Sequence, residues 1–376
     1  MSKNIFCYIY VCVVACIVLI PVLTMNHDTN VKSMIDNSYL PEFPEILGNR
    51  DMPAEMNQYI NKRIGFREEC IYLYEAAVDK IFHELAVPGY MYGKNGNIMG
   101  SVDRYIADYQ HLNLQEDKAV IENFAEWLTD VNQYLEEKDI VFLYFLPTDK
   151  KTIYPECMPN TIHVYGNRSR TDMLLEQIED VPYIYPKKEF LEAKKQQQIY
   201  NLKYDVLHWN DLGSFIGHKL VDDYLQQKCT GIVPLSVEQY ELSYENTRCR
   251  LAASNFYVYD KIPTYSLIET EQIQDISTED SFGLNGNDSF EHYINNGLPD
   301  APTILILHDS YIAGGAKYYT GRYHEVISVD NNHHEKLQAL VEHYQPDIVL
   351  FEAVERTLSR NSYLKEWDLI SDITNP

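Results

Sequence analysis

The chain has 376 residues, enough for one large domain or one domain with an elaboration. It carries 56 acidic and 31 basic side chains, a formal net charge of -25 that repels phosphate backbones and argues against nucleic acid as a partner. Its seven cysteines are scattered and have neither the pattern of a disulfide scaffold nor a metal-binding spacing.

The first expected element is an apolar helix over residues 5–25, IFCYIYVCVVACIVLIPVLTM, which is long enough to cross a membrane. Lys3 precedes it, so the positive-inside rule places the amino terminus in the cytoplasm and the rest of the chain outside. A cleaved secretory signal is the alternative. No small-residue cleavage site follows the apolar run, which favours an uncleaved anchor over residues 1–25 and a polar tether over 26–55.

Residues 56–376 are expected to form one α/β domain. Apolar residues at helical spacing predict helices over 56–85, 115–138, 171–178, 211–227, 312–319 and 333–344. Apolar runs predict strands over 139–147, 181–185, 303–307, 325–329 and 347–351, and Gly and Asn predict a hairpin over 90–100. This alternation indicates a parallel sheet covered on both faces. Residues 228–300 break the rhythm and are interpreted as a strand-rich insertion, with an irregular excursion as the alternative.

One buried strand ends abruptly in three polar residues, His308, Asp309 and Ser310. The carboxyl ends of parallel strands are where α/β proteins bind ligands. If a helix follows at once, the Ser310 hydroxyl lies at the positive end of its dipole, beside backbone N–H groups that can stabilise an oxyanion. That geometry suits a nucleophile. The alternative is that Asp309 or Ser310 only caps the helix.

A second segment, YDVLHWNDLG at 204–213, offers the groups that a serine nucleophile needs. A serine hydroxyl requires an imidazole to take its proton, and the imidazole requires a carboxylate to fix its tautomer. Asp205 and His208 are spaced to supply both from one loop. Asn210 is expected to cap the next helix with Trp209 packed into the core, which is compatible with the catalytic interpretation.

No metal site is expected. The closest candidate is the group formed by His324, His333 and His334, and no carboxylate completes a convincing ligand spacing.

The two polar segments resemble a known family. HDSY at 308–311 resembles the Gly-Asp-Ser block of SGNH hydrolases, and DVLH at 205–208 matches their Asp-x-x-His block, although those enzymes usually carry the serine first. The order found here is similar to that of alginate-type and DHHW-like polysaccharide O-acetyltransferases. Further similar segments are RIGFRE at 63–68, YGKNGNIMG at 92–100, LPTDKKTIYPE at 146–156 and PDIVLFEAVER at 346–356.

Two features depart from the family pattern. Two residues separate Asp205 from His208, where alginate-type enzymes usually have one, and His308 stands in the place of the usual Gly. The first departure bears on which carboxylate orients the imidazole. The second puts a side chain at a tight turn, where it can reshape the turn or add a second imidazole.

The resemblance implies a three-layer, SGNH-hydrolase-like α/β fold over 56–376, with Ser310 as nucleophile, His208 as general base and Asp205 as its orienting carboxylate. The family's oxyanion and substrate-binding positions fall near Asn331 and Arg356, with Trp209 beside the base. A structural ion pair between Glu355 and Arg356 is the alternative interpretation of the last position.

The function implied is extracytoplasmic transfer of an acetyl group, through an acyl-serine, to hydroxyls of a cell-surface or exported polysaccharide. It requires no cofactor, and it implies a multi-span membrane-bound O-acyltransferase as acetyl donor and a single-pass location in the cell membrane. Two alternatives remain open. One is a carbohydrate esterase with the same three residues. The other is a catalytically silent glycan-binding scaffold, suggested by the tether and the 31 tyrosines.

Overall fold

The computed structural model describes residues 3–33, 35–36, 38–46, 50–252, 254–284, 290–312 and 315–359. The chain divides into two compact units, one of Met1–Met91 with Arg248–Tyr259 and one of Tyr92–Thr247 with Asp260–Pro376. The last part of the predicted catalytic domain, 360–376, lies outside the described residues.

The first unit begins with the apolar helix α1 (Lys3–Leu23), whose segment Ile5–Leu23 has a mean hydropathy of 2.8, is unburied and is long enough to cross a membrane. The helical periodicity over 56–85 corresponds to two helices, α2 (Met52–Arg63) and α3 (Arg67–Phe82). They separate at Gly65, whose N–H donates to the Pro21 carbonyl at 2.9 Å and whose position beside Thr24 leaves no room for a Cβ.

The polar segment that follows α1 packs against the end of α2. Arg63 is buried, and its guanidinium donates to the carbonyl oxygens of Asn26 and Asp28 at 2.9 Å each and of Pro41 at 2.7 Å. The short pair β1 (Lys32–Ser33) and β2 (Ser38–Tyr39) lies in the same segment. Residues of the predicted tether therefore have fixed partners within the first unit.

A seven-stranded sheet forms the centre of the second unit, in the order β6-β5-β13-β11-β12-β10-β9. The first five strands are parallel, as predicted. Two short strands from the 228–300 segment extend the sheet in antiparallel fashion. The strands are β5 (Val141–Phe145), β6 (Tyr183–Ile184), β9 (Ile273–Asp275), β10 (Glu291–Asn295), β11 (Thr303–His308), β12 (Glu325–Asp330) and β13 (Ile348–Glu352).

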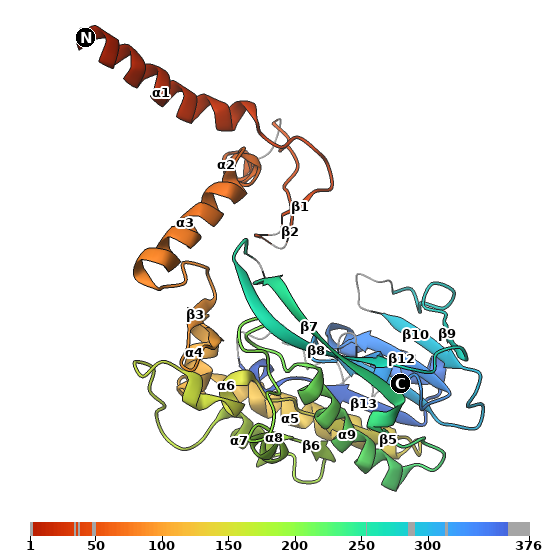
Figure 1. Ribbon diagram of the computed structural model, residues 1–376. Helices are drawn as coiled ribbons and strands as arrows, with labels where there is room; N and C mark the ends of the chain where they lie inside the picture. The colour runs from red at the N-terminus through yellow and green to blue at the C-terminus, as the bar shows by residue number, and fades with distance from the viewer. Residues whose placement is uncertain are drawn as a thin grey trace. The chain divides into compact units, whose positions relative to one another are not determined.

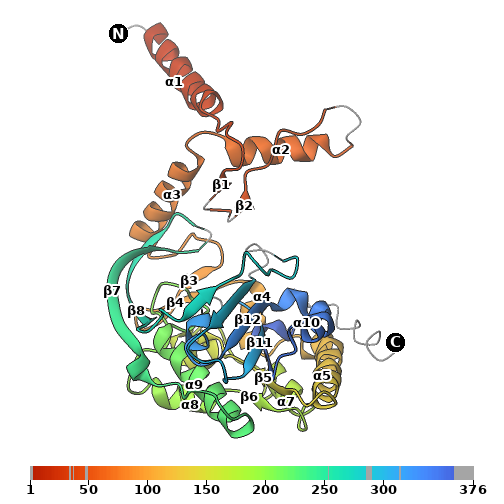
Figure 2. The ribbon, with the colours of Figure 1, turned by 90° about the vertical axis from the view of Figure 1, so that its right-hand side faces the viewer.

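Helices cover both faces of this sheet (Figures 1 and 2). Alternate side chains of β5 point to opposite faces. Tyr144 meets Phe124 of α5 (Leu114–Glu136), with ring centroids 5.7 Å apart, and Phe145 meets Trp209, next to α9 (Asp211–Lys228), at 5.8 Å. The helix α10 (Leu337–Tyr344) packs on the α5 face, where a large core cluster lies. Both faces of the strands are thus apolar, as the sequence pattern predicted.

The other elements complete the described part of the chain. They are β3 (Tyr90–Tyr92), β4 (Ile98–Gly100), α4 (Asp103–Tyr109), α6 (Lys150–Ile153), α7 (Arg170–Leu175), α8 (Lys187–Ala193), β7 (Tyr240–Arg250) and β8 (Tyr257–Leu267). Short 3-10 helices are η1 (Pro155–Cys157), η2 (Val237–Gln239), η4 (Ala316–Tyr318), η5 (Asn331–Lys336) and η6 (Glu355–Thr357).

The helix predicted over 312–319 is wrong. Within the described part of that range there is only the three-residue η4, and residues 313–314 lie outside the described residues. Gly314 and Gly315 have low helix propensity, which opposes a helix directly after the turn at Ser310.

Candidate active site

The site lies at the carboxyl edge of the parallel strands. β11 is central, between β13 and β12, with Leu307 opposite Phe351 and His308 opposite Asp330. Ser310 follows the end of β11 and is exposed. The loops that follow β5 and β13 emerge at the same edge, because parallel strands end together.

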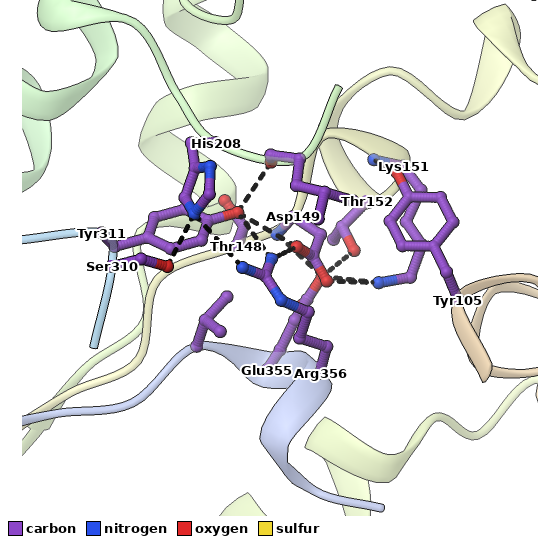
Figure 3. Close-up of polar contacts among 12 residues, drawn as sticks. Tyr105, Thr148, Asp149, Lys151, Thr152, His208, Ser310, Tyr311, Glu355 and Arg356 are labelled. Carbon is purple, nitrogen blue, oxygen red and sulfur yellow. Dashed lines mark hydrogen bonds and ion pairs between the residues drawn. The ribbon is translucent and has the colours of Figure 1, made fainter. Parts of the chain in front are cut away.

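Asp205, His208 and Ser310 form a continuous hydrogen-bonded triad (Figure 3 shows the contact between His208 and Ser310). His208 Nε2 lies 2.7 Å from Ser310 Oγ, and His208 Nδ1 lies 2.7 and 2.8 Å from the two oxygens of Asp205. Because a carboxylate only accepts, Nδ1 carries the proton and Nε2 is left to accept from the serine hydroxyl. This is the protonation state that a general base requires.

The loop conformation at Asp205 brings its carboxylate back toward His208. Asp205 has φ +47°, a left-handed conformation that short polar side chains tolerate. Its Oδ1 also accepts the backbone N–H groups of Leu207 at 3.3 Å and His208 at 3.2 Å. Burial opposes ionisation, but the hydrogen bonds that the carboxylate accepts from His208 and Leu207 outweigh it and hold the pKa of Asp205 below its ordinary value.

Two buried acidic side chains, Asp309 and Glu352, hold the turn at Ser310 through hydrogen bonds to backbone N–H groups. Asp309 accepts the N–H groups of Tyr311 at 2.8 Å and Val354 at 2.9 Å, and its own N–H donates to Glu352 at 2.8 Å. Burial and the neighbouring Asp309 raise the pKa of Glu352 well above its usual range. His308 is buried, with Nδ1 donating to the Asp309 carbonyl at 2.7 Å, so this imidazole braces the turn.

The predicted oxyanion donors lie in different surroundings from those expected. Residues 310–312 form a turn, so the described residues after Ser310 do not begin the expected helix. Asn331 is fully buried, and its amide donates to the Glu352 carbonyl at 2.7 Å, tying the end of β12 to β13. Trp209 is buried too. Its Nε1–H donates to the Tyr311 carbonyl at 3.2 Å and links the two halves of the triad.

Of the two residues predicted to bind the oxyanion or the substrate, Asn331 and Arg356, Arg356 lies beside the catalytic base, His208. Its Nη2 is 3.4 Å from His208 Nε2, and its guanidinium lies 5.1 Å from the centre of the Tyr311 ring. The ion-pair partner is Asp149, and not Glu355 as the sequence suggested. Because a guanidinium has only donors, its position next to Nε2 also requires that nitrogen to be unprotonated.

Sequence reasoning missed the buried ionic network beside the triad (Figure 3). Lys150 and Lys151 follow β5, and both are buried. Asp149 accepts from Lys151 at 2.5 Å, from the Tyr311 hydroxyl at 3.0 Å and from Arg356. Burial opposes its ionisation, yet the two cations lower the pKa of Asp149 to about 2. The only sequence signal was the polar TDKK after an apolar strand.

A cavity of about 200 Å³ opens at the triad. Its lining residues are Asp205, His208, Trp209, Asp211, Ser214, Ser310, Tyr311, Gly315, Lys317 and Tyr318. A larger cavity of about 520 Å³ lies between the ends of β8, β9 and β10 and contains no triad residue. Among the described residues, no group of three His, Cys, Asp or Glu side chains is placed to hold a metal ion.

No protein-family model and no curated protein matches the chain. Among solved structures it is similar to the O-acetyltransferase domain of Pseudomonas putida AlgJ, with 12% identity over 77% of this chain and 99% of that one, and a TM-score of 0.54. It is also similar to Bacillus cereus PatB1 with a sulfonyl adduct, with 18% identity over 64% of this chain and 91% of that one, and a TM-score of 0.51. A DHHW family protein from Eubacterium siraeum has 13% identity over 77% of this chain and 97% of that one, and a TM-score of 0.50.

These similarities confirm the predicted fold. The chain has an SGNH-type α/β architecture, with a mostly parallel sheet between helical layers and an apolar helix at its amino terminus. At such low identity the likeness extends to the fold alone.

Proposed function

We propose that this chain is a serine-dependent O-acetyltransferase that modifies a polysaccharide. The observation that carries the proposal is the single imidazole, His208, in contact with Ser310 Oγ on one side and the Asp205 carboxylate on the other. Such a triad has no evident use in a silent scaffold, because a structural role needs neither an exposed hydroxyl nor an oriented base.

Acylation begins when Ser310 Oγ attacks the carbonyl carbon of an acetyl donor and its proton moves to His208 Nε2. Asp205 stabilises the imidazolium that forms. The Arg356 guanidinium is the charged donor proposed for the oxyanion, in place of a helix amino terminus. Collapse of the tetrahedral intermediate breaks the bond to the leaving group, which takes the proton from Nε2 and leaves acetyl-Ser310.

Transfer reverses these steps. A sugar hydroxyl attacks the acetyl carbon and gives its proton to His208 Nε2, and the Ser310 oxygen then leaves and takes the proton back. The cavity of about 200 Å³ suits a small acyl group. The O-acetyltransferase domain among the structural neighbours supports this reaction class.

The site is proposed to act outside the cytoplasm, with α1 as a single-pass anchor in the cell membrane. The apolar, unburied α1 supports this location. Acetyl-coenzyme A is made in the cytoplasm, so the acetyl group must reach the site through a partner. We expect a multi-span membrane-bound O-acyltransferase to supply it.

The test uses the full chain in detergent with a chromogenic acetyl ester, with and without oligosaccharide acceptors. We expect mass spectrometry to find one acetyl group on Ser310 and acetylated sugar among the products. Ser310→Ala abolishes both. Ser243→Ala removes an exposed hydroxyl of β7 outside this cavity and is the matched control, which retains acylation. Wild-type protein without an acetyl group on Ser310 would refute the proposal.

A carbohydrate esterase is the second candidate, because Ser310 is exposed and water can reach it. Acetyl-Ser310 that forms but never passes to any sugar, with acetate as the only product, would favour hydrolysis.

A further inference from the structure

The loop of residues 201–208, which carries both Asp205 and His208, has no regular secondary structure. Its backbone groups therefore need partners from elsewhere, and those partners decide where the base lies. Two buried side chains of opposite charge supply most of them, Lys150 at the start of α6 and Asp260 on β8.

Lys150 binds the carbonyl groups at the beginning of the loop. It is fully buried, and its ammonium donates to the carbonyl oxygens of Asn201 at 2.7 Å, Leu202 at 2.9 Å and Ile98 at 3.0 Å. These three bonds use all three N–H donors of the ammonium. The Lys150 backbone N–H also donates to the Leu207 carbonyl at 3.3 Å.

Asp260 binds the amide groups that follow. Its Oδ2 accepts the backbone N–H of Lys203 at 2.7 Å and of Tyr204 at 3.0 Å, immediately before Asp205. It is 8% exposed. Beyond this point the loop closes on its own carboxylate, because Asp205 accepts the amides of Leu207 and His208.

We propose that Lys150 and Asp260 are positioning residues that hold the 201–208 loop in the conformation in which His208 reaches Ser310. The inference rests on the proposed function for its kinetic consequence, and on the contacts above for the geometry. Neither side chain lines the cavity at the triad. Both act through the backbone of the loop.

The ammonium of Lys150 makes this arrangement sensitive to alkali. Burial lowers the pKa of Lys150 to about 8, against the opposing charges of Cys157, Asp260 and Asp205. A neutral amine has two N–H donors for these three carbonyl acceptors, two in the loop and one at Ile98, so the three-bond arrangement that joins the loop to Ile98 is lost as pH rises above this value. Arg at this position stays protonated and keeps the charge.

The experiment measures the rate at which an aryl sulfonyl fluoride labels Ser310 in the full chain. We expect Lys150→Met and Asp260→Ala to label about 100-fold more slowly, because a small displacement of the base is enough for such a loss. Lys203→Met removes a lysine charge from the same loop but keeps the backbone amide, and it labels like wild type. Labelling of wild type declines above about pH 8, and Lys150→Arg moves that decline upward.

Hydrogen–deuterium exchange of peptides covering 201–208 gives a second readout that is independent of chemistry. Folded Lys150→Met or Asp260→Ala exchanges this loop faster than wild type, whereas α5 is unchanged. If Lys150→Met does not fold, labelling and exchange of Asp260→Ala and the pH profile of Lys150→Arg decide whether these residues position the loop. Unchanged labelling together with unchanged exchange in a folded variant overturns the inference. Wild type that resists labelling overturns the proposed function instead, and the exchange measurement still tests the loop.

Discussion

The role of Arg356 can be separated from its contribution to stability by pairing it with Asp149. Arg356→Met removes the proposed oxyanion donor and also leaves a buried carboxylate without its guanidinium. The Arg356 side chain is 16% exposed and that of Asp149 is 0% exposed, so the cost is that of breaking a buried pair. Breaking a buried ion pair costs about 3 to 5 kcal/mol of unfolding free energy. Because Lys151 still contacts Asp149 at 2.5 Å, we expect a loss near the lower value, about 3 kcal/mol.

The rate effect is expected to behave differently. Loss of one charged donor to an oxyanion costs about 100- to 1,000-fold in acylation, about 2.7 to 4 kcal/mol. In the double variant Asp149→Asn/Arg356→Met, no uncompensated carboxylate remains, so most of the stability returns, while the acylation rate stays as low as in Arg356→Met.

The assay combines urea unfolding with stopped-flow acylation of Ser310 by a chromogenic acetyl ester. Asp149→Asn alone is the control, because it weakens the pair but keeps the donor, and we expect its acylation rate to fall by less than about tenfold. If the double variant regains the wild-type acylation rate along with its stability, Arg356 is only a structural partner and the reasoning fails.

Three further changes test other parts of the site. Asp205→Asn can hold His208 in the wrong tautomer, so acylation should fall by about 10,000-fold with unfolding little changed; a loss below tenfold would contradict the triad. Trp209→Phe loses the 3.2 Å bond to the Tyr311 carbonyl and should lower unfolding free energy by about 1 kcal/mol in chemical denaturation, and an unchanged midpoint would argue against that bond. Burial raises the pKa of Glu355 to about 7 from 4.5, so the folded state binds a proton that the unfolded chain releases. The contribution of this proton to the unfolding free energy is full below pH 4.5 and is lost as pH rises to about 7. Glu355→Gln should therefore flatten the decline of unfolding free energy between these pH values, and an unchanged decline would exclude Glu355 as its cause.

Much of this site follows from short-range sequence patterns. Asp205 and His208 are three residues apart in one loop, and Ser310 follows an apolar strand, so the chemistry of each segment was visible in the sequence. The parallel sheet followed from apolar strands alternating with helices. The helix after Ser310 was wrongly predicted, because the periodicity of Ile312 to Tyr319 outweighed the helix-breaking effect of Gly314 and Gly315.

The partners of Arg356 and Lys150 were beyond sequence reasoning for a physical reason. Asp149 and Arg356 are 207 residues apart, and they meet only because β5 and β13 are neighbours in the sheet. Strand order is set by packing across the whole domain, so a charge after one strand gives no sign of its partner after another. A lysine at such a strand end is usually solvated, and the burial of Lys150 depends on the carbonyl groups of Asn201 and Leu202, far along the chain.

The exposure of the triad bears on how transfer can compete with hydrolysis. Ser310 is exposed, and the side chains of His208 and Asp205 are 23% and 33% exposed, so burial of the triad itself does not exclude water. An acceptor must then win by being held close to acetyl-Ser310, at a high effective concentration. This favours a polymer bound at several sugar units over a free monosaccharide. Loss of acetyl-Ser310, followed by mass spectrometry, should therefore accelerate and saturate as oligosaccharide length increases. A rate independent of acceptor length would mean that water is the natural acceptor.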